Sequence, residues 1–158
     1  MSLDSSWDAL VRGVQCPFCA PRPDESPFWI KVRGLTVSTL YLDRNQAFRG
    51  QSVLVFDRRH VVGLEALDPD EYLALSGDLR SAGRAVATAC QPDLMNYASL
   101  GNVIPHLHWH LVPRYRSDPR WGGPIYTTTK AEMPERRLSA PAYEELVRLI
   151  NVAFDAAT

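Results

Sequence analysis

Hydrophobic and polar residues alternate in short runs over the first third of the chain, and this period-two pattern predicts β-strands. Residues 28–33 ("FWIKVR") and 36–43 ("TVSTLYLD") are rich in β-branched and aromatic side chains and are separated by Gly34, so both are expected to be strands. Residues 52–56 ("SVLVF") follow the turn signal at Gly50 and predict a third, buried strand.

A period of three to four residues replaces this alternation in two later segments and predicts two amphipathic helices. The first begins after Asp68, a possible N-cap, with Pro69 at the first helical position and Glu71 completing a capping box. Its apolar stripe is expected to contain Tyr72, Leu75, Leu79, Ala82 and Val86. The second helix is predicted at about residues 140–156, with a stripe formed by Tyr143, Leu146, Val147, Ile150 and Phe154.

Two more strands are predicted between these helices, at residues 94–100 ("LMNYASL") and 106–112 ("HLHWHLV"). The strands follow one another as meanders around one long helix. This order favours an α+β fold with a largely antiparallel five-stranded sheet, one long central helix and a C-terminal amphipathic helix. With 158 residues, a single domain over 1–158 is expected, with its core at about 16–115 and a long loop at 113–138.

Composition and charge exclude several classes of protein. The net charge of −1 argues against a nucleic-acid scaffold or a polybasic membrane anchor. No apolar run approaches the roughly 20 residues that cross a bilayer, and the first residues lack the basic-then-apolar pattern of a signal peptide. We therefore expect a cytoplasmic protein without membrane or nucleic-acid partners.

Three of the four histidines, His106, His108 and His110, occupy alternate positions in "IPHLHWHLVPRY". Alternate side chains of a strand share one face, so neighbouring imidazoles are expected about 6.6 Å apart. The opposite face is apolar and predicts core or a subunit contact: Leu107, Trp109 and Leu111. A half-buried strand with a polar face would explain one histidine better than three.

Two kinds of chemistry suit such a histidine face. The imidazoles could bind one metal ion, although three successive alternate positions span too far to converge easily on a tetrahedral ion. They could instead serve phosphoryl transfer, in which a neutral imidazole attacks phosphorus and its neighbours position and protonate the departing group. The histidine spacing alone leaves both open.

A second candidate metal group lies near the N-terminus, where Cys16 and Cys19 form "CPFC". The two-residue gap lets both thiolates bind one zinc ion at about 2.3 Å, and His60 is a natural third ligand. A metal-free turn and a redox pair are the alternatives, but a redox motif should open a helix and prolines follow here instead. Cys90 is expected to be a small buried residue.

The stretch "NVIPHLHWHLVPRY" resembles the signature of the histidine triad family of nucleotide hydrolases and nucleotidyl transferases. The flanking segments "LMNYASLGN", "RGQSVLVFDRRHV" and "DPDEY" strengthen the resemblance, which covers roughly residues 16–115. It implies an α+β fold, a homodimer, and cleavage at a nucleotide's α-phosphate through a nucleotidyl-histidine intermediate. The implied substrates are dinucleoside polyphosphates, such as diadenosine tri- or tetraphosphate, or nucleotide phosphoramidates. Water, phosphate or a sugar phosphate could be the acceptor.

The resemblance also implies roles for individual residues. His108 would be the nucleophile, and His110 would contact the phosphate and the leaving-group oxygen. Asn102 would donate to the phosphate, and Asn96 would help to hold phosphate and ribose. Asp43 would bind the ribose hydroxyls, with an ordinary turn aspartate as the alternative.

For the cysteine motif, the resemblance implies a structural zinc ion with four ligands: Cys16, Cys19, His60 and His106. The middle histidine, His108, would then stay available for chemistry. The chain departs from many family members at Gly50-Gln51, where they have Gly-His, so one auxiliary histidine is absent.

The long loop after the histidines is both basic and aromatic, with Arg114, Tyr115, Arg116, Arg120, Trp121 and Tyr126. Its arginines could neutralise a polyphosphate and Trp121 could stack on a second base, or the loop could be a solvated surface or a dimer contact. Two other functions stay open for the whole chain. One is a zinc-containing nucleotide-binding regulatory module with little turnover, and the other is a metal-dependent hydrolase with the histidines as ligands.

Overall fold

The computed structural model describes residues 3–118, 120–125 and 135–156. Their elements, in chain order, are α1 (Leu3–Val11), β1 (Trp29–Gly34), β2 (Ser38–Asp43), β3 (Ser52–Phe56), the 3₁₀ helix η1 (Leu64–Ala66), α2 (Pro69–Cys90), β4 (Leu94–Ala98), β5 (His108–Arg114) and α3 (Ala140–Asp155). The predicted strands and both predicted helices are confirmed, with ends shifted by up to two residues. Helices α1 and η1 were not predicted.

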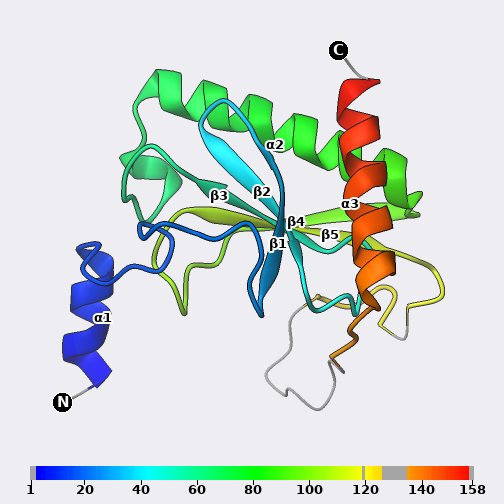
Figure 1. The fold of residues 1–158 in the computed structure, drawn as a ribbon. Coiled ribbons are helices and arrows are strands. Elements are labelled where there is room, and N and C mark those ends of the chain that lie inside the picture. The colour runs from blue at the N-terminus through cyan, green and yellow to red at the C-terminus, as the bar shows by residue number, and fades with distance from the viewer. Residues whose placement is uncertain (1–2, 119, 126–134, 157–158) are drawn as a thin grey trace.

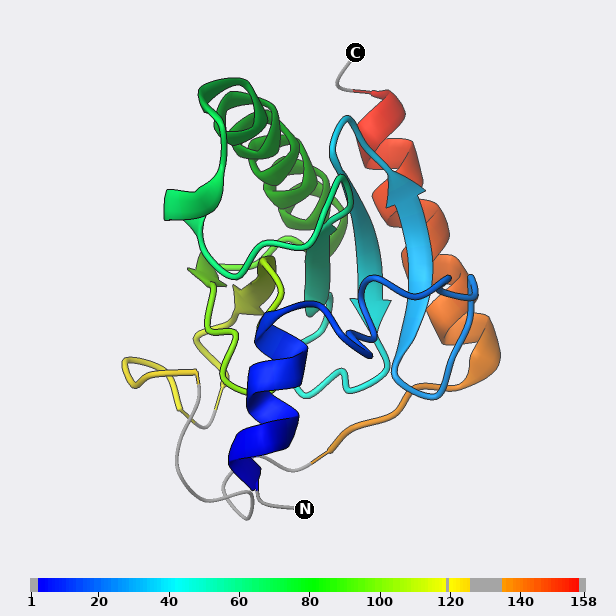
Figure 2. The same cartoon turned by 90° about the vertical axis from the view of Figure 1, so that its left-hand side faces the viewer.

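The strands form one antiparallel sheet in the order β1-β2-β3-β5-β4 (Figure 1). Helices α2 and α3 lie together over one face of this sheet, while α1 lies on the other side of the molecule (Figures 1 and 2). The architecture confirms the predicted α+β class. None of the helices in the described part of the chain has the length and apolarity that crossing a bilayer requires.

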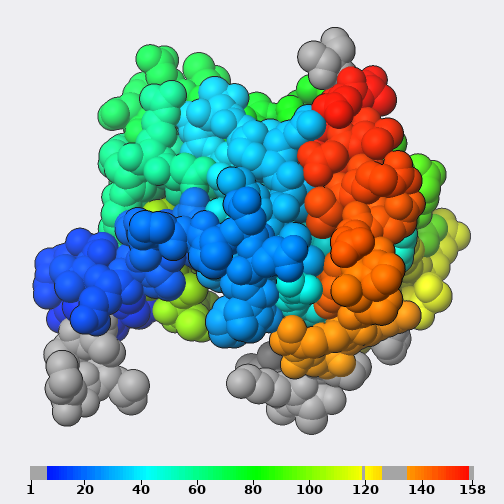
Figure 3. All heavy atoms as spheres, viewed as in Figure 1, coloured from blue at the N-terminus to red at the C-terminus, as the bar shows by residue number. Residues whose placement is uncertain are grey.

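The alternation along the central strands separates a core face from a second face. Leucines and phenylalanines at alternate positions have no exposed surface and pack beneath α2 and α3: Leu40, Leu42, Leu54, Phe56 and Leu111. On the opposite face, Tyr41 and Val55 pack with Cys16 and Phe18 from the segment that follows α1. In Figure 3 the chain that follows α1 runs across the face of the molecule toward β1, which lies next to α3.

Helix α2 confirms the predicted N-terminus and corrects one predicted core residue. The Asp68 backbone N–H donates to the Glu71 side chain at 3.2 Å, as the capping box requires. Tyr72 is 49% exposed, so its assignment to the buried stripe was wrong. The buried position in the first turn is Glu71, whose carboxylate is held by Arg59, and the stripe continues from it through Leu75.

The strand that carries the histidines starts later than predicted. β5 begins at His108, and His106 lies before the strand. The reason is the pairing of Leu107, which donates to the Val61 carbonyl and accepts from the Phe56 N–H outside the regular ladder. The His106 side chain contacts the segment after α1, where Cys16, Phe18 and Cys19 lie.

Candidate functional site

Four of the predicted residues form a metal-ligand cluster: Cys16, Cys19, His60 and His106. One ligand atom from each lies within 4.8 Å of all the others. The His106 Nδ1 is 3.5 Å from both sulfurs, and the His60 Nδ1 is 3.4 Å from the Cys19 Sγ. A tetrahedron with zinc–ligand bonds of 2.0–2.3 Å has edges of about 3.5 Å, so these separations fit one zinc ion.

Backbone carbonyls orient both imidazoles of this cluster. The His106 Nε2–H donates to the Phe56 carbonyl at 2.7 Å, and the His60 Nε2–H donates to the Val11 carbonyl at 3.0 Å. In each ring the proton is therefore on Nε2, and the lone pair on Nδ1 points into the cluster. Gly13, at φ +79°, lets the chain pass close to His60, since a Cβ there would lie 3.0 Å from its ring.

The surroundings of the thiols do not suit a redox pair. Burial, and then the neighbouring Cys16 thiol, raise the pKa of Cys19 to about 11 in the absence of metal. A reactive redox thiol needs a lowered pKa and usually opens a helix, whereas residues 16–19 form a turn that follows the end of α1. A bound cation would reverse this shift, because it stabilises the thiolates directly.

His108 and His110 share the sheet face opposite α2 and lie beside each other on β5. Their ring centroids are 5.0 Å apart, and their strand partners on β3 are Val55 and Val53. The His108 Nδ1–H donates to the carbonyl of His106 at 2.6 Å, so its lone pair is on Nε2. Burial lowers the pKa of His108, and burial with the nearby His108 lowers that of His110 to about 4. Both imidazoles are consequently neutral at pH 7.

Asp43 ends β2 on the same face of the sheet. Its Oδ1 accepts the Asn45 backbone N–H at 2.7 Å, and its Oδ2 accepts the Gln51 amide at 2.9 Å. Burial raises its pKa, although these two hydrogen bonds oppose the rise. Gln51 therefore contributes a neutral amide that holds this carboxylate.

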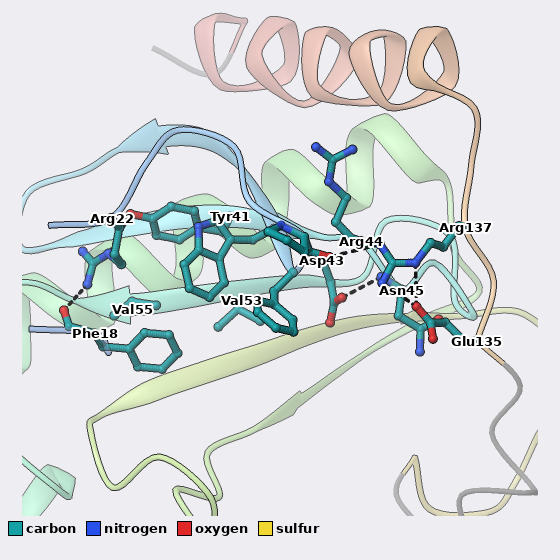
Figure 4. Close-up of a pocket in the computed structure, with 13 residues that line it drawn as sticks. Phe18, Arg22, Tyr41, Asp43, Arg44, Asn45, Val53, Val55, Glu135 and Arg137 are labelled. Atoms are coloured by element: carbon teal, nitrogen blue, oxygen red, sulfur yellow. Dashed lines mark hydrogen bonds and ion pairs between the residues drawn. The ribbon is translucent and has the colours of Figure 1, made fainter. Parts of the chain in front are cut away.

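A cavity of about 390 Å³ runs over these strands (Figure 4). Asp43, Glu135 and Arg137 lie at one end, and Phe18 and Arg22 lie at the other. Its floor and walls are largely aromatic and aliphatic: Phe18, Phe28, Trp29, Tyr41, Val53 and Val55. Because the ring centroids of Phe18 and His108 are 5.2 Å apart, the cavity adjoins the histidine pair. Its size and lining suit a small aromatic ligand.

The other described residues that the sequence predicted for the site do not line this cavity. Asn96 on β4 shares the histidine face, but its Oδ1 accepts from the buried Arg114 guanidinium at 3.0 Å. Asn102 lies in the β4–β5 connection with an exposed side chain, which makes no hydrogen bond to the described residues. Arg114 also pairs with Asp118 in the interior, so it is not a solvated loop arginine. Trp121 is 43% exposed, and Tyr126 lies outside the described residues.

Sequence reasoning missed most of the cavity lining. Tyr41 could have been found, because it precedes Asp43 by two positions and so shares its face of β2. Arg22 and Arg137 lie in irregular segments, where no periodicity indicates which way a side chain points. They reach the cavity only through the folding of segments that flank the sheet.

Comparison with known proteins assigns the family. A model of the HIT domain matches residues 38–117, half of the chain. The adenylylsulfatase HINT3 of Arabidopsis thaliana is 30% identical over 129 residues, which cover 76% of this chain and 64% of that protein. An uncharacterized HIT-like protein of Mycoplasma genitalium is 28% identical over 87 residues, or 52% of this chain and 62% of that protein. The chain thus matches less than two thirds of the length of either relative.

Solved structures share the fold at low sequence identity. A histidine triad protein from Bradyrhizobium japonicum is 20% identical, with a TM-score of 0.74 over 87% of this chain and 99% of that one. A zinc-bound histidine triad family protein from Mycobacterium smegmatis is 23% identical, with a TM-score of 0.59 over 97% and 96% of the two chains. The chain therefore belongs to the histidine triad family, a family of nucleotide hydrolases and nucleotidyl transferases.

Proposed function

We propose that this protein cleaves a nucleotide at its α-phosphate by way of an adduct on His108. The substrate class is a dinucleoside polyphosphate, such as diadenosine tetraphosphate, or a nucleoside phosphoramidate. The observation that carries the proposal is the hydrogen bond from the His108 Nδ1–H to the His106 carbonyl, because it leaves the Nε2 lone pair as the nucleophile.

The reaction is a double displacement. The His108 Nε2 forms a bond to the α-phosphorus while the bond to the leaving-group oxygen or nitrogen breaks, and the leaving group takes the electron pair; a nitrogen leaving group also takes a proton from water and departs as the neutral amine. Water then attacks the same phosphorus, the P–N bond breaks, and its electron pair returns to Nε2 while the water's proton passes to solvent. The neutral His110 can donate one N–H to a phosphate oxygen during both steps.

The cavity supports a nucleoside as the part of the substrate that is held. Asp43 can accept both ribose hydroxyls, and the aromatic lining can pack against a base. Asn96 and Asn102 come from the β4 side of the histidines, and we propose that they complete the phosphate contacts when substrate binds. Apo side chains often reach such contacts only in the substrate complex.

Zinc has a structural role in this proposal. The cluster of Cys16, Cys19, His60 and His106 would hold the ion and tie the N-terminal segment to the start of β5. In the part of the chain that the structure describes, this is the one group of three or more candidate ligands, and it contains neither His108 nor His110. That arrangement favours the histidine nucleophile over a hydrolase that uses all three histidines as metal ligands.

The test is intact-protein mass spectrometry under non-acidic conditions, after brief mixing with diadenosine or diguanosine tetraphosphate. We expect wild-type protein to gain one nucleoside monophosphate, with released nucleotides seen by chromatography in the same samples. The His108→Ala variant should show neither. His110→Ala is the matched control, because it removes the other neutral imidazole of the pair but keeps the nucleophile and should still form adduct slowly.

Release that survives in His108→Ala would overturn the histidine nucleophile and move a metal-dependent hydrolase to first place. Tight nucleotide binding without adduct or release would instead support a regulatory binding module. Melting temperatures of the variants show whether a lost signal reflects lost folding.

We also propose a homodimer. β4 is an end strand of the sheet, and Leu94 and Tyr97 on it are 53% and 45% exposed. Unpaired strand edges with apolar side chains are a common surface for self-association. Light scattering of the wild type and of Tyr97→Asp should show twice the chain mass for the first and one chain mass for the second.

A further inference from the structure

The cavity of Figure 4, which is called the nucleoside cavity from here on, has different hydrogen-bonding groups at its two ends. At one end, the side chain of Arg22 makes three hydrogen bonds and is only 12% exposed. Its Nε donates to the Tyr41 hydroxyl at 2.8 Å, one terminal nitrogen donates to the Phe18 carbonyl, and the other donates to Asp57. A guanidinium held in this way is preorganised and loses little side-chain entropy on binding a ligand.

Hydrogen-bond donors remain at this end after the internal bonds are counted. A guanidinium has five N–H groups, and three are used by Tyr41, Phe18 and Asp57. The Tyr41 oxygen accepts from Arg22, so its own O–H must point elsewhere. The nearby acceptors are the Phe18 carbonyl and the Asp57 carboxylate, which both accept hydrogen bonds from Arg22, and Asp57 also accepts one from the Thr39 hydroxyl at 2.6 Å. Asp57 lines a neighbouring cavity and not the nucleoside cavity, whereas Arg22 and Tyr41 line both cavities.

At the opposite end of the cavity, the carboxylates of Asp43 and Glu135 lie together with the guanidinium groups of Arg44 and Arg137 (Figure 4). With the ribose hydroxyls on Asp43, as the proposed function has it, the base extends between Tyr41 and Phe18 toward Arg22. The edge of the base that meets Arg22 and Tyr41 then faces donors. Such an end suits a base edge that presents acceptors.

We propose that Arg22 and Tyr41 select a 6-oxopurine, guanine or hypoxanthine, over adenine. A 6-oxopurine presents O6 and N7, two adjacent acceptors that match an arginine, and this pairing is the most common specific contact of arginine with a base. Adenine presents a donor at N6 beside N7, so its amino group would face the guanidinium N–H groups. This inference rests on the proposed function for the orientation of the nucleoside.

Equilibrium binding of inosine and adenosine 5′-monophosphates to the wild-type protein tests the inference without turnover. The two nucleotides differ at position 6 and in the N1 proton that accompanies it. We expect inosine monophosphate to bind about tenfold more tightly, which is within the usual discrimination of one bidentate base contact. Guanosine monophosphate should behave like inosine monophosphate. Equal affinities, tighter binding of adenosine monophosphate, or no binding of any of them would overturn the inference.

Two variants locate the selectivity. Arg22→Met should bring the inosine-to-adenosine affinity ratio to near one, mainly by weakening the inosine nucleotide. Tyr41→Phe keeps the ring and removes one donor, so it should lower the ratio only in part. Lys31→Met is the matched control, because Lys31 lines the neighbouring cavity and not this one. Its ratio should equal that of the wild type.

The outcomes separate this inference from the proposed function. Nucleotide release that needs His108 but is equally fast for inosine and adenosine phosphoramidates leaves the function standing and removes base selection. A tenfold binding preference with no nucleotide release from either substrate leaves base selection standing and removes the proposed function. Because binding by the wild type decides the inference, a poorly folded Arg22→Met variant cannot leave it undecided.

Discussion

His106 and His108 are separated by one residue, yet their rings have opposite tautomers. His106 donates from Nε2 to the Phe56 carbonyl and presents Nδ1 to two cysteine sulfurs. His108 donates from Nδ1 to the carbonyl of His106 itself and presents Nε2. A carbonyl can only accept, so each bond fixes which nitrogen has the lone pair.

The comparison teaches that residue type and spacing do not set the role of a histidine. Both rings are buried, and burial lowers the pKa of both. What differs is the position of a backbone acceptor: for His106 it lies on β3, and for His108 it lies two residues back in its own chain. The proposed function assigns a metal to the first ring and an electrophile to the second, in keeping with these tautomers.

The largest expected effect comes from comparing the activity and the zinc content of His108→Ala with those of His106→Ala. His108→Ala should lower kcat/KM for a nucleoside phosphoramidate by about 10⁶-fold, as removal of a nucleophile does in other enzymes. Its zinc content, measured by atomic emission, should stay at one ion per chain. His106→Ala should show the opposite pattern, with zinc lost and activity reduced only as far as the fold is weakened. If His108→Ala loses zinc, or His106→Ala keeps it, the two roles are not divided as their tautomers indicate.

The next largest effect is the stabilisation of the fold by zinc at the cluster that contains His106. Removing zinc with a chelator should lower the free energy of unfolding by about 4 kcal/mol, for a protein held at free zinc a thousandfold above its dissociation constant. Thermal unfolding with and without the chelator measures this loss. Cys19→Ala should lose both the zinc and the response to chelator.

The chain offers a matched thiol for this experiment. Cys90 is buried on α2 outside the cluster, and burial raises its pKa to about 11. Cys90→Ala should therefore keep one zinc ion and the full response to chelator. A response in Cys19→Ala as large as that of the wild type would place the stabilising metal elsewhere.

A smaller effect concerns the neutral state of the histidine pair. Burial lowers the pKa of His110 to about 4, so its folded-state pKa is depressed below the value of 6.5 in the unfolded chain. The stability from the neutral ring is fully present above pH 6.5 and is lost as pH falls toward 4, by at most about 3 kcal/mol. Urea unfolding from pH 7 to pH 4 should show a shallower loss for His110→Gln than for the wild type. Parallel losses would mean that His110 does not titrate in this range.

Much of the fold could be predicted from the sequence because its elements depend on local pattern. The helix at Pro69–Cys90 has its cap, its proline and its stripe in one continuous segment. Tyr72 failed because the stripe, which is buried from Leu75 onward, does not continue into the first turn, where Glu71 is the buried residue. Helix α1 was missed, since none of the start and stop signals used for the other helices identified it.

The candidate site could be predicted only in part, for a similar reason. The four metal-ligand residues have types and spacings that predict their chemistry, and the structure brings them together. The tautomers depend on the carbonyls of Phe56 and Val11, and a backbone acceptor has no signature in the sequence. Arg22 reaches the cavity from an irregular segment, so its position depends on tertiary packing and not on a local pattern.

The smallest expected effect tests whether fixed hydrogen bonds also set the role of Asp43. Gln51 and Asn45 each donate to one of its oxygens, which directs the remaining lone pairs toward the cavity. Asp43→Asn should reduce the preference for a ribonucleotide over its 2′-deoxy form by about tenfold, the value of one hydrogen bond to a charged group. Because burial raises the pKa of Asp43, the wild-type preference should also weaken as pH falls through that raised value. Glu135→Gln, at the same end of the cavity, keeps Asp43 and should therefore show the wild-type preference, including its weakening at low pH. A preference that persists in Asp43→Asn would mean that Asp43 is an ordinary turn residue. Hydrogen bonds to the backbone would then indicate the roles of His106 and His108 but not that of Asp43.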